Sequence, residues 1–171
     1  MENSNHSNVL IIGGGCAGIS VASRLNSLKS SLKISIIEPS DKALYQAAWT
    51  LVGAGAYNKS NTIKPMSDVM PKYVNWIKSY AETFSPEQNL VKTSNGDYTY
   101  DYLVVCPGLK LNFNGVEGLT ESLGKNNVCT NYEADMAEYT WECLKNLKGG
   151  NLLFTEPPMP IKCAGAPQKI A

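Results

Sequence analysis

The fold of this chain is decided by its first apolar stretch, Val9-Leu10-Ile11-Ile12-Gly13-Gly14-Gly15-Cys16-Ala17-Gly18. The four residues before the glycines are apolar and three of them are β-branched, which predicts a strand that is buried on both faces. Gly13, Gly15 and Gly18 then match the pattern G-x-G-x-x-G. In this pattern one glycine forms a tight turn, one lets the backbone approach a pyrophosphate, and one lets the next helix pack closely on the strand.

The residues after the glycines continue the same unit. Apolar residues recur at helical spacing from Ile19 to Leu28, which predicts a helix whose N-terminal amide groups face the phosphates. A second strand is expected over residues 33–37, and Glu38 follows it, 20 residues after Gly18. A carboxylate there accepts a hydrogen bond from a ribose 2′-hydroxyl and repels a 2′-phosphate, which disfavours NADP. This order of elements predicts a Rossmann-like α/β domain, and a glycine turn that binds nothing is the alternative.

Length and composition exclude several classes of protein. The 171 residues suffice for one domain with a sizeable core, or for one domain and the start of another. The 15 basic and 15 acidic side chains balance, so we expect no nucleic-acid partner. No apolar run reaches the ~20 residues of a membrane-spanning helix, and residues 1–7 lack a signal or transit pattern. Five scattered cysteines and one histidine predict neither a metal site nor a disulfide framework.

The segment from Tyr45 to Gly55 is rich in aromatic and small residues. Small residues allow either a planar ligand or another part of the chain to come close, and Gln46 could hydrogen-bond such a ligand. The residues by themselves favour ordinary packing of a short helix.

The next part of the chain predicts β structure. Apolar residues between Val74 and Cys106 predict short strands, and Asn95-Gly96 predicts a type I′ hairpin turn with positive φ at both central residues. Three antiparallel strands would form a meander, and a further parallel strand, Leu103 to Cys106, would end in the small-residue turn Cys106-Pro107-Gly108.

The C-terminal third predicts a helix over residues 132–147, with Cys143 on its apolar side, and then a strand over residues 152–155. A second glycine fingerprint would follow this strand in a second nucleotide-binding unit, but Pro157 to Cys163 stand in its place. Pro167 predicts the start of a helix just after Cys163. The helix N-terminus and the neighbouring Lys162 both favour a thiolate, so Cys163 is the expected nucleophile, with an inert loop cysteine as the alternative.

Several stretches, taken together, resemble sulfide:quinone oxidoreductase, in particular the branch that includes the mitochondrial enzyme. They are Gly13-Gly14-Gly15-Cys16-Ala17-Gly18, Glu38-Pro39-Ser40, Tyr45-Gln46, Trp49-Thr50-Leu51-Val52-Gly53-Ala54-Gly55-Ala56, Val74-x-Trp76-Ile77-Lys78 and Lys162-Cys163-Ala164-Gly165-Ala166-Pro167-Gln168-Lys169. The resemblance runs from residue 8 to the last residue. It implies the two-dinucleotide-binding flavoprotein fold of the disulfide reductases. Residues 8–110 would be the first part of the FAD-binding domain, including the meander, and residues 111–171 the connecting helix and the start of the second domain.

The resemblance also implies an activity. Sulfide would be oxidised to persulfide or sulfane sulfur through two cysteines that flank FAD, and the electrons would pass to ubiquinone or menaquinone. A small thiophilic acceptor would take the sulfur. Cys163 matches the flavin-side cysteine. The residues that match FAD contacts are Gly13, Gly15, Cys16, Ala17, Gly18, Glu38, Gln46, Ala81 and Gly108.

The family's second active cysteine, its second FAD motif and its membrane-docking segment lie beyond residue 171. We therefore expect the chain to be the front part of a longer protein and to be inactive alone. The whole protein would lie peripherally on the cytoplasmic face of a bacterial inner membrane, or alternatively on the mitochondrial inner membrane. Two rival functions are an NADH:quinone oxidoreductase of the same fold, which needs a second glycine fingerprint, and a non-catalytic nucleotide-binding fragment.

Overall fold

The computed structural model describes residues 5–156, 165 and 168. The chain divides into two compact units, which we call the sheet unit, residues 1–43 and 64–109, and the helical unit, residues 44–63 and 110–171. The predicted domain boundary at residue 110 lies next to this division, whereas residues 44–63 group with the second unit. Which residues form functional domains stays a prediction.

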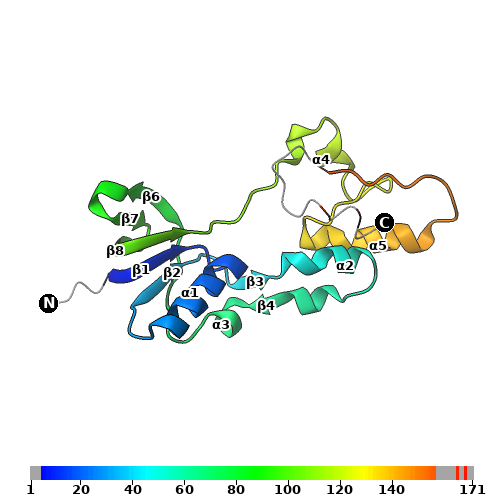
Figure 1. Ribbon diagram of the computed structural model, residues 1–171. Coiled ribbons are helices and arrows are strands. Elements are labelled where there is room, and N and C mark those ends of the chain that lie inside the picture. The colour runs from blue at the N-terminus through cyan, green and yellow to red at the C-terminus, as the bar shows by residue number, and fades with distance from the viewer. Residues whose placement is uncertain (1–4, 157–164, 166–167, 169–171) are drawn as a thin grey trace. The chain divides into compact units, whose positions relative to one another are not determined.

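The sheet unit contains a six-stranded sheet in the order β5-β2-β1-β8-β7-β6. Figure 1 labels every strand of this sheet except β5. Its strands are β1 (His6–Ile12), β2 (Ile34–Ile37), β5 (Asn75–Ile77), β6 (Ala81–Ser85), β7 (Leu90–Thr93) and β8 (Gly96–Val105). Strand β1 pairs in parallel with β2 and β8, and β2 pairs in parallel with β5. The β6–β7 and β7–β8 pairs are antiparallel, and the 3-10 turn η3 (Pro86–Gln88) joins β6 to β7.

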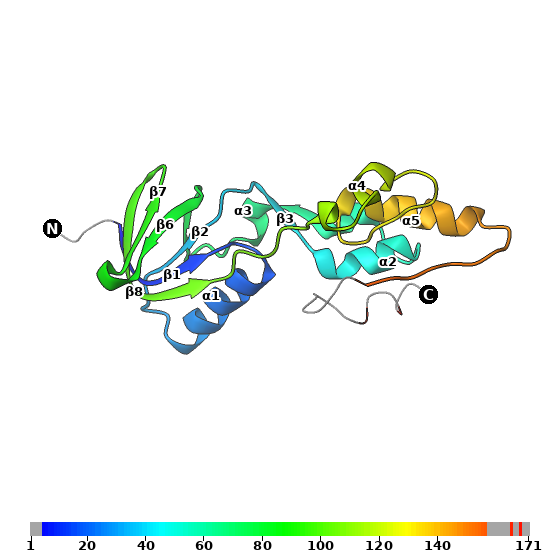
Figure 2. The same cartoon turned by 90° about the horizontal axis from the view of Figure 1, so that it is seen from above.

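Strand β1 is buried on both faces because its side chains alternate between two hydrophobic cores. Val9 and Ile11 join Ile34, Ile36 and Ala22 of α1 (Cys16–Leu28), which lies on one face of the sheet (Figure 2). The short helix α3 (Met66–Val69) adds Met66 to this core. On the opposite face the core consists of Leu10, Ile12, Ile37, Ile77, Val91 and Tyr100. The predicted buried strand, the helix after it and the second strand are all confirmed.

Two details of the predicted meander are wrong. The third meander strand and the parallel strand after it are one continuous strand, β8, which pairs with β7 over Gly96–Thr99 and with β1 over Thr99–Val105. The hairpin turn forms, but Thr93 pairs with Gly96, so Ser94 and Asn95 are its central residues. Gly96 follows them with φ 129°, a conformation that a residue with a Cβ rarely adopts. The Thr93 hydroxyl accepts a hydrogen bond from the Asn95 N–H and donates one to the Gly96 carbonyl, which fixes this register.

The helical unit is built around α5 (Ala134–Asn146), which confirms the helix predicted over residues 132–147. Its other elements are η1 (Gln46–Ala48), α2 (Trp49–Gly53), η2 (Lys59–Thr62), η4 (Phe113–Gly115) and α4 (Leu119–Ser122). Trp49 and Val52 of α2 pack against Ala137 of α5. A two-stranded sheet, β3 (Lys42–Leu44) with β4 (Ile63–Pro65), lies where the chain passes from one unit to the other.

The strand predicted over residues 152–155 is wrong, because residues 151–156 adopt neither helix nor strand. A strand needs a partner with which to exchange backbone hydrogen bonds, and no strand in the described part of the chain pairs with this segment. Its apolar side chains stay accessible, with Leu153 87% exposed.

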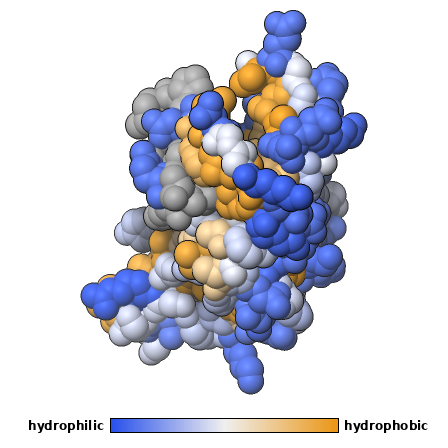
Figure 3. Space-filling view, turned by 90° about the vertical axis from the view of Figure 1, so that its right-hand side faces the viewer, coloured by the Kyte–Doolittle hydropathy of each residue, from blue (hydrophilic) through white to orange (hydrophobic). Residues whose placement is uncertain are grey.

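Figure 3 shows apolar surface between hydrophilic patches on one face of the molecule. None of the described helices combines the length and apolar character needed to cross a membrane.

Candidate functional site

The turn between β1 and α1 is so tight that two of its positions accept only glycine. Gly13 has φ 97°, and a Cβ there would overlap the carbonyl oxygen of Cys106 at the end of β8. A Cβ on Gly18 would overlap the carbonyl oxygen of Gly13 and would lie 3.2 Å from Cγ2 of Ile11. These two glycines therefore let α1 start directly behind the strand and pack against it.

Gly15 differs from its neighbours because the space beyond it is open. Among the described residues, no atom lies within 4 Å of a Cβ built on Gly15, and Gly15, Cys16 and Ala17 are all exposed. No side chain in the described part of the structure caps the N-terminus of this 13-residue helix, α1, so its first amide groups find no side-chain partner there. Unpaired N–H groups and the positive end of the helix dipole together favour an anion. The turn is therefore shaped to admit a phosphate group, as a dinucleotide cofactor would require.

The carboxylate of Glu38 lies beside this turn. Its Oε2 accepts a hydrogen bond from the Gly14 N–H at 2.8 Å, and its Oε1 accepts one from the Ser40 N–H at 2.8 Å. A carboxylate has about four lone-pair sites, so about two remain for the hydroxyl groups of a ligand. The position after β2 thus presents an oriented acceptor next to an anion site, which fits an adenosine ribose and a pyrophosphate.

Gly14, which the fingerprint pattern does not include, lies against the side chain of Glu38. A Cβ on Gly14 would lie 2.8 Å from both Cβ and Cγ of Glu38, and 3.2 Å from the Met70 methyl carbon. Any other residue would push the carboxylate away from the turn. The signal in the sequence is the run of three glycines, one more than the pattern needs.

Two further predicted cofactor contacts belong to the sheet unit, and one of them, Gly108, lies at the same edge of the sheet. The Cys106 N–H donates to the Ile12 carbonyl at 2.7 Å, which brings the end of β8 against the end of β1. Gly108 follows there with φ 75°, is exposed, and has open space where a Cβ would lie. Ala81 begins β6, after the carboxyl end of β5, and packs against the second core. Ligands of open α/β sheets bind outside the carboxyl ends of the strands.

Two predicted site residues remain, Gln46 and Cys163. Gln46 belongs to the helical unit, where its side-chain amide donates to the Tyr132 carbonyl at 3.3 Å. Cys163, the expected nucleophile, lies outside the described residues. The cofactor-binding and catalytic roles assigned from the sequence stay predictions.

In the helical unit the small residues serve packing. A Cβ on Gly53 would overlap the side-chain oxygen of Asn131. Gly55 has φ 72°, and a Cβ there would lie 2.5 Å from Cδ2 of Trp141 on α5. The planar group that comes close to this stretch is therefore an indole of the chain itself, as the packing interpretation of Tyr45 to Gly55 predicts.

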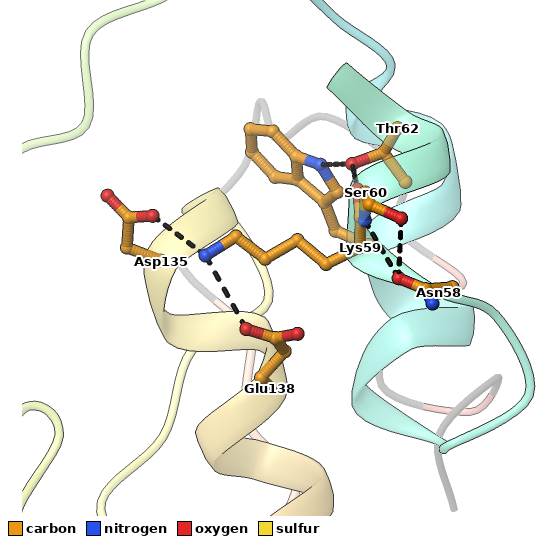
Figure 4. A network of polar contacts seen from close by, with 7 residues as sticks. Asn58, Lys59, Ser60, Thr62, Asp135 and Glu138 are labelled. Carbon is orange, nitrogen blue, oxygen red and sulfur yellow. Dashed lines mark hydrogen bonds and ion pairs between the residues drawn. The ribbon is translucent and has the colours of Figure 1, made fainter.

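A polar network ties η2 to α5 (Figure 4). The Lys59 ammonium lies 2.9 Å from Oδ1 of Asp135 and 3.5 Å from Oε2 of Glu138, on α5. The hydrogen bond to Asp135 raises the pKa of Lys59 above its usual value. Thr62 accepts a hydrogen bond from the Trp49 indole at 3.2 Å and donates one to the Lys59 carbonyl at 2.7 Å. A shallow hollow of about 340 Å³ lies beside this network. The contacts are explained by packing and require no ligand.

The surroundings of Cys129 disfavour its thiolate form. Burial, followed by a hydrogen bond with Cys143, raises the pKa of the Cys129 thiol to about 11. Cys143 is half-buried on α5, consistent with the packing role predicted for it. Within the part of the chain that the structure describes, no group of three or more His, Cys, Asp and Glu side chains could hold a metal ion.

Comparisons with known proteins identify the relatives of this chain. It is 47% identical over 97% of its length to the mitochondrial sulfide:quinone oxidoreductase of Dictyostelium discoideum, and 40% identical over 97% to that of Mus musculus. The chain spans 37% of the length of each of these two relatives. The crystal structure of the sulfide:quinone oxidoreductase from Aquifex aeolicus matches 83% of this chain and 32% of that chain, with a TM-score of 0.65 and 31% identity.

The family model described as pyridine nucleotide-disulphide oxidoreductase matches residues 7–140, which include the glycine turn, Glu38 and nearly the whole sheet. The predicted flavoprotein fold of the disulfide reductases and the resemblance to sulfide:quinone oxidoreductases are therefore confirmed. This chain belongs to the pyridine nucleotide-disulphide oxidoreductase family.

Proposed function

We propose that the protein oxidises sulfide and passes the electrons to a quinone, with FAD as its cofactor. The observation that carries this proposal is the 40–47% identity, over 97% of the chain, to two sulfide:quinone oxidoreductases. The chain spans 37% of their length, so its own share of the work is to hold the adenosine half of the cofactor and to supply one cysteine. Residues 8–110 would belong to the FAD-binding domain and residues 111–171 to the start of the second domain.

The sheet unit supports the cofactor part of this proposal. The amide groups at the start of α1 would hold the pyrophosphate, and the carboxylate of Glu38 would accept a hydrogen bond from the adenosine ribose. The open space at Gly15 and Gly108 leaves room for the cofactor beside the backbone. When bound, FAD supplies the two-electron redox chemistry that amino-acid side chains lack.

The sulfur chemistry would begin at a bridge between Cys163 and a second cysteine. Sulfide attacks the second sulfur, the S–S bond breaks, and Cys163 leaves as a thiolate while the attacked cysteine keeps a persulfide. Lys162 beside Cys163 would stabilise that thiolate. A small thiophilic molecule would then accept the sulfane sulfur. Because two of the relatives are mitochondrial enzymes, we propose peripheral attachment to the mitochondrial inner membrane, with a bacterial inner membrane as the alternative.

A chimaera tests the activity. This chain would replace the stretch of the Dictyostelium relative that aligns with it. The purified flavoprotein would be mixed with sulfide or with NADH in the absence of oxygen. We expect sulfide to bleach the visible flavin absorbance and NADH to leave it unchanged. Cys163→Ala should abolish the bleaching, while Cys129→Ser, a matched control at a thiol of raised pKa, should not. Bleaching by NADH and not by sulfide would show that the proposed function is wrong.

The nucleotide site can be tested in the chain itself. Gly15→Ala adds a methyl group in open space, so we expect unchanged stability and roughly tenfold weaker FAD binding, because the methyl group occupies the approach to the amide groups. Binding would be followed by quenching of flavin fluorescence, and stability by urea unfolding. Equal FAD affinity in both proteins would place the pyrophosphate elsewhere.

A further inference from the structure

Trp76 connects strand β5 to Glu38, the residue that follows β2. In the parallel register of these strands Trp76 lies opposite Ile36, two residues before Glu38. Its indole N–H donates a hydrogen bond to the main-chain carbonyl of Glu38 at 2.8 Å. The ring itself is half-buried and packs against the core that contains Val9 and Ile11. The indole is therefore held rigidly where it meets the end of β2.

Glu38 is held at four points. Its N–H donates to the Ile77 carbonyl at 3.0 Å, and its carboxylate accepts from the N–H groups of Gly14 and Ser40 at 2.8 Å each. These three partners are backbone groups. The fourth, the indole of Trp76, is a side chain and can therefore be changed without altering the backbone.

The Glu38 carbonyl depends on this indole because the next two residues offer it no donor. Residue 39 is proline, which carries no N–H, and the Ser40 N–H already donates to the Glu38 carboxylate. The last pair of the β2–β5 ladder is Ile37 with Ile77, so the carbonyl of Glu38 lies just beyond the regular register. A main-chain carbonyl without a donor turns toward water, and the peptide plane turns with it. Such a rotation would move Ser40, whose N–H holds Oε1 of the Glu38 carboxylate.

We propose that Trp76 is a positioning residue for nucleotide recognition. By holding the peptide plane after Glu38, it aims the free lone pairs of the carboxylate at the ribose 2′-hydroxyl. The proposal rests on the proposed function, in that the ligand carries an adenosine diphosphate group. Its consequence is specific: loss of the indole N–H should weaken recognition of the 2′-hydroxyl and leave the pyrophosphate contacts as they are.

The test compares binding of ADP and 2′-deoxy-ADP to the 171-residue chain by titration calorimetry. A hydrogen bond to a charged group is worth roughly tenfold in affinity or more, so we expect the native chain to prefer ADP by about tenfold. Trp76→Phe, which keeps an aromatic ring and removes the donor, should reduce the preference to roughly twofold, with 2′-deoxy-ADP affinity unchanged. Trp49→Phe is the matched control, since it removes an indole donor in the helical unit, and should leave the preference intact.

An unchanged tenfold preference in Trp76→Phe would overturn the positioning role while leaving the nucleotide site in place. Failure of the native chain to bind ADP, or equal affinity for both nucleotides, would instead overturn the proposed site and the role of Trp76 with it. If Trp76→Phe does not fold, hydrogen exchange in the native chain decides. Coupling between two sites is reciprocal, so ADP should slow exchange of the Trp76 indole proton more than 2′-deoxy-ADP does. Equal slowing would refute the proposal.

Discussion

The two glycine-rich stretches of this chain look alike in sequence and do different things. In the turn Gly13–Gly18 of the sheet unit, Gly13 and Gly18 lie so close to other backbone atoms that a side chain would not fit. The space beyond Gly15, in contrast, is open to solvent. At Gly53 and Gly55 of the helical unit, the side chains of Asn131 and Trp141 occupy the space that a Cβ would need. Glycine content therefore marks close approach, and only the surroundings decide whether a ligand or the chain itself approaches.

The largest effect expected from this comparison is on Gly18. In Gly18→Ala the new Cβ overlaps the Gly13 carbonyl oxygen, so β1 and α1 must separate. We expect a loss of about 3 kcal/mol in the free energy of unfolding, the upper range for overpacking. Gly15→Ala, three residues away and in open space, is the matched control and should change stability by less than about 0.5 kcal/mol. Urea unfolding followed by circular dichroism measures both, and similar losses would contradict the contrast within the turn.

A smaller effect is expected at Gly55. The Cβ of Gly55→Ala would lie 2.5 Å from the Trp141 ring, and alanine is strained at φ 72°, so we expect a loss of about 2 kcal/mol. Gly118→Ala measures the contribution of backbone strain alone, because Gly118 has a similar φ of 75° and no described atom lies within 4 Å of a Cβ there. We expect this substitution to reduce the free energy of unfolding by about 1 kcal/mol.

A double-mutant cycle with Trp141→Ala sharpens this prediction, since removal of the ring should recover about 1 kcal/mol of the Gly55→Ala loss. Additive losses would mean that the indole does not fill the space above Gly55.

A further effect concerns the thiols of the two units. Cys16 is exposed at the open turn, whereas Cys129 packs near Cys143 and has a pKa raised from 9.0 to about 11. At pH 8 Cys129 should hold roughly 100-fold less thiolate than an ordinary thiol, and its alkylation by iodoacetamide should be correspondingly slow. Bound ADP should protect Cys16 and leave Cys129 unaffected. Mass spectrometry of labelled peptides measures both rates.

The same shift predicts a pH dependence of stability. The folded state favours the neutral thiol of Cys129, so its contribution is complete below about pH 9 and is lost as the pH rises from about 9 to about 11. Cys129→Ser should remove that part of the alkaline decline. Rapid labelling of Cys129 at pH 8 would show that its surroundings are as open as those of Cys16.

The sequence predicts the parts of the fold that depend on neighbouring residues. β1, α1, β2 and the position of Glu38 follow from periodicity and from a fingerprint near the start of the chain. The contact of Trp141 with Gly55 joins residues far apart in the chain, and no local pattern encodes it. The donor that Trp76 supplies to Glu38 likewise spans 38 residues. The expected strand over 152–155 has a strand-like composition, but without a pairing partner among the described strands it remains irregular.

The continuous strand β8 also bears on how the sheet assembles. Its first half pairs with β7 across a turn whose central residues are Ser94 and Asn95, whereas its second half pairs with β1, and His6 and Thr99 in that pair are 93 residues apart. Local hairpins form in microseconds, and distant pairings wait for the closure of long loops. If the β7–β8 hairpin forms first, β8 is already extended when β1 pairs with it. Closing the long loop between β1 and β8 then has to order only β1. We therefore expect the β7–β8 turn to influence how fast β1 joins the sheet, although it lies outside the glycine turn.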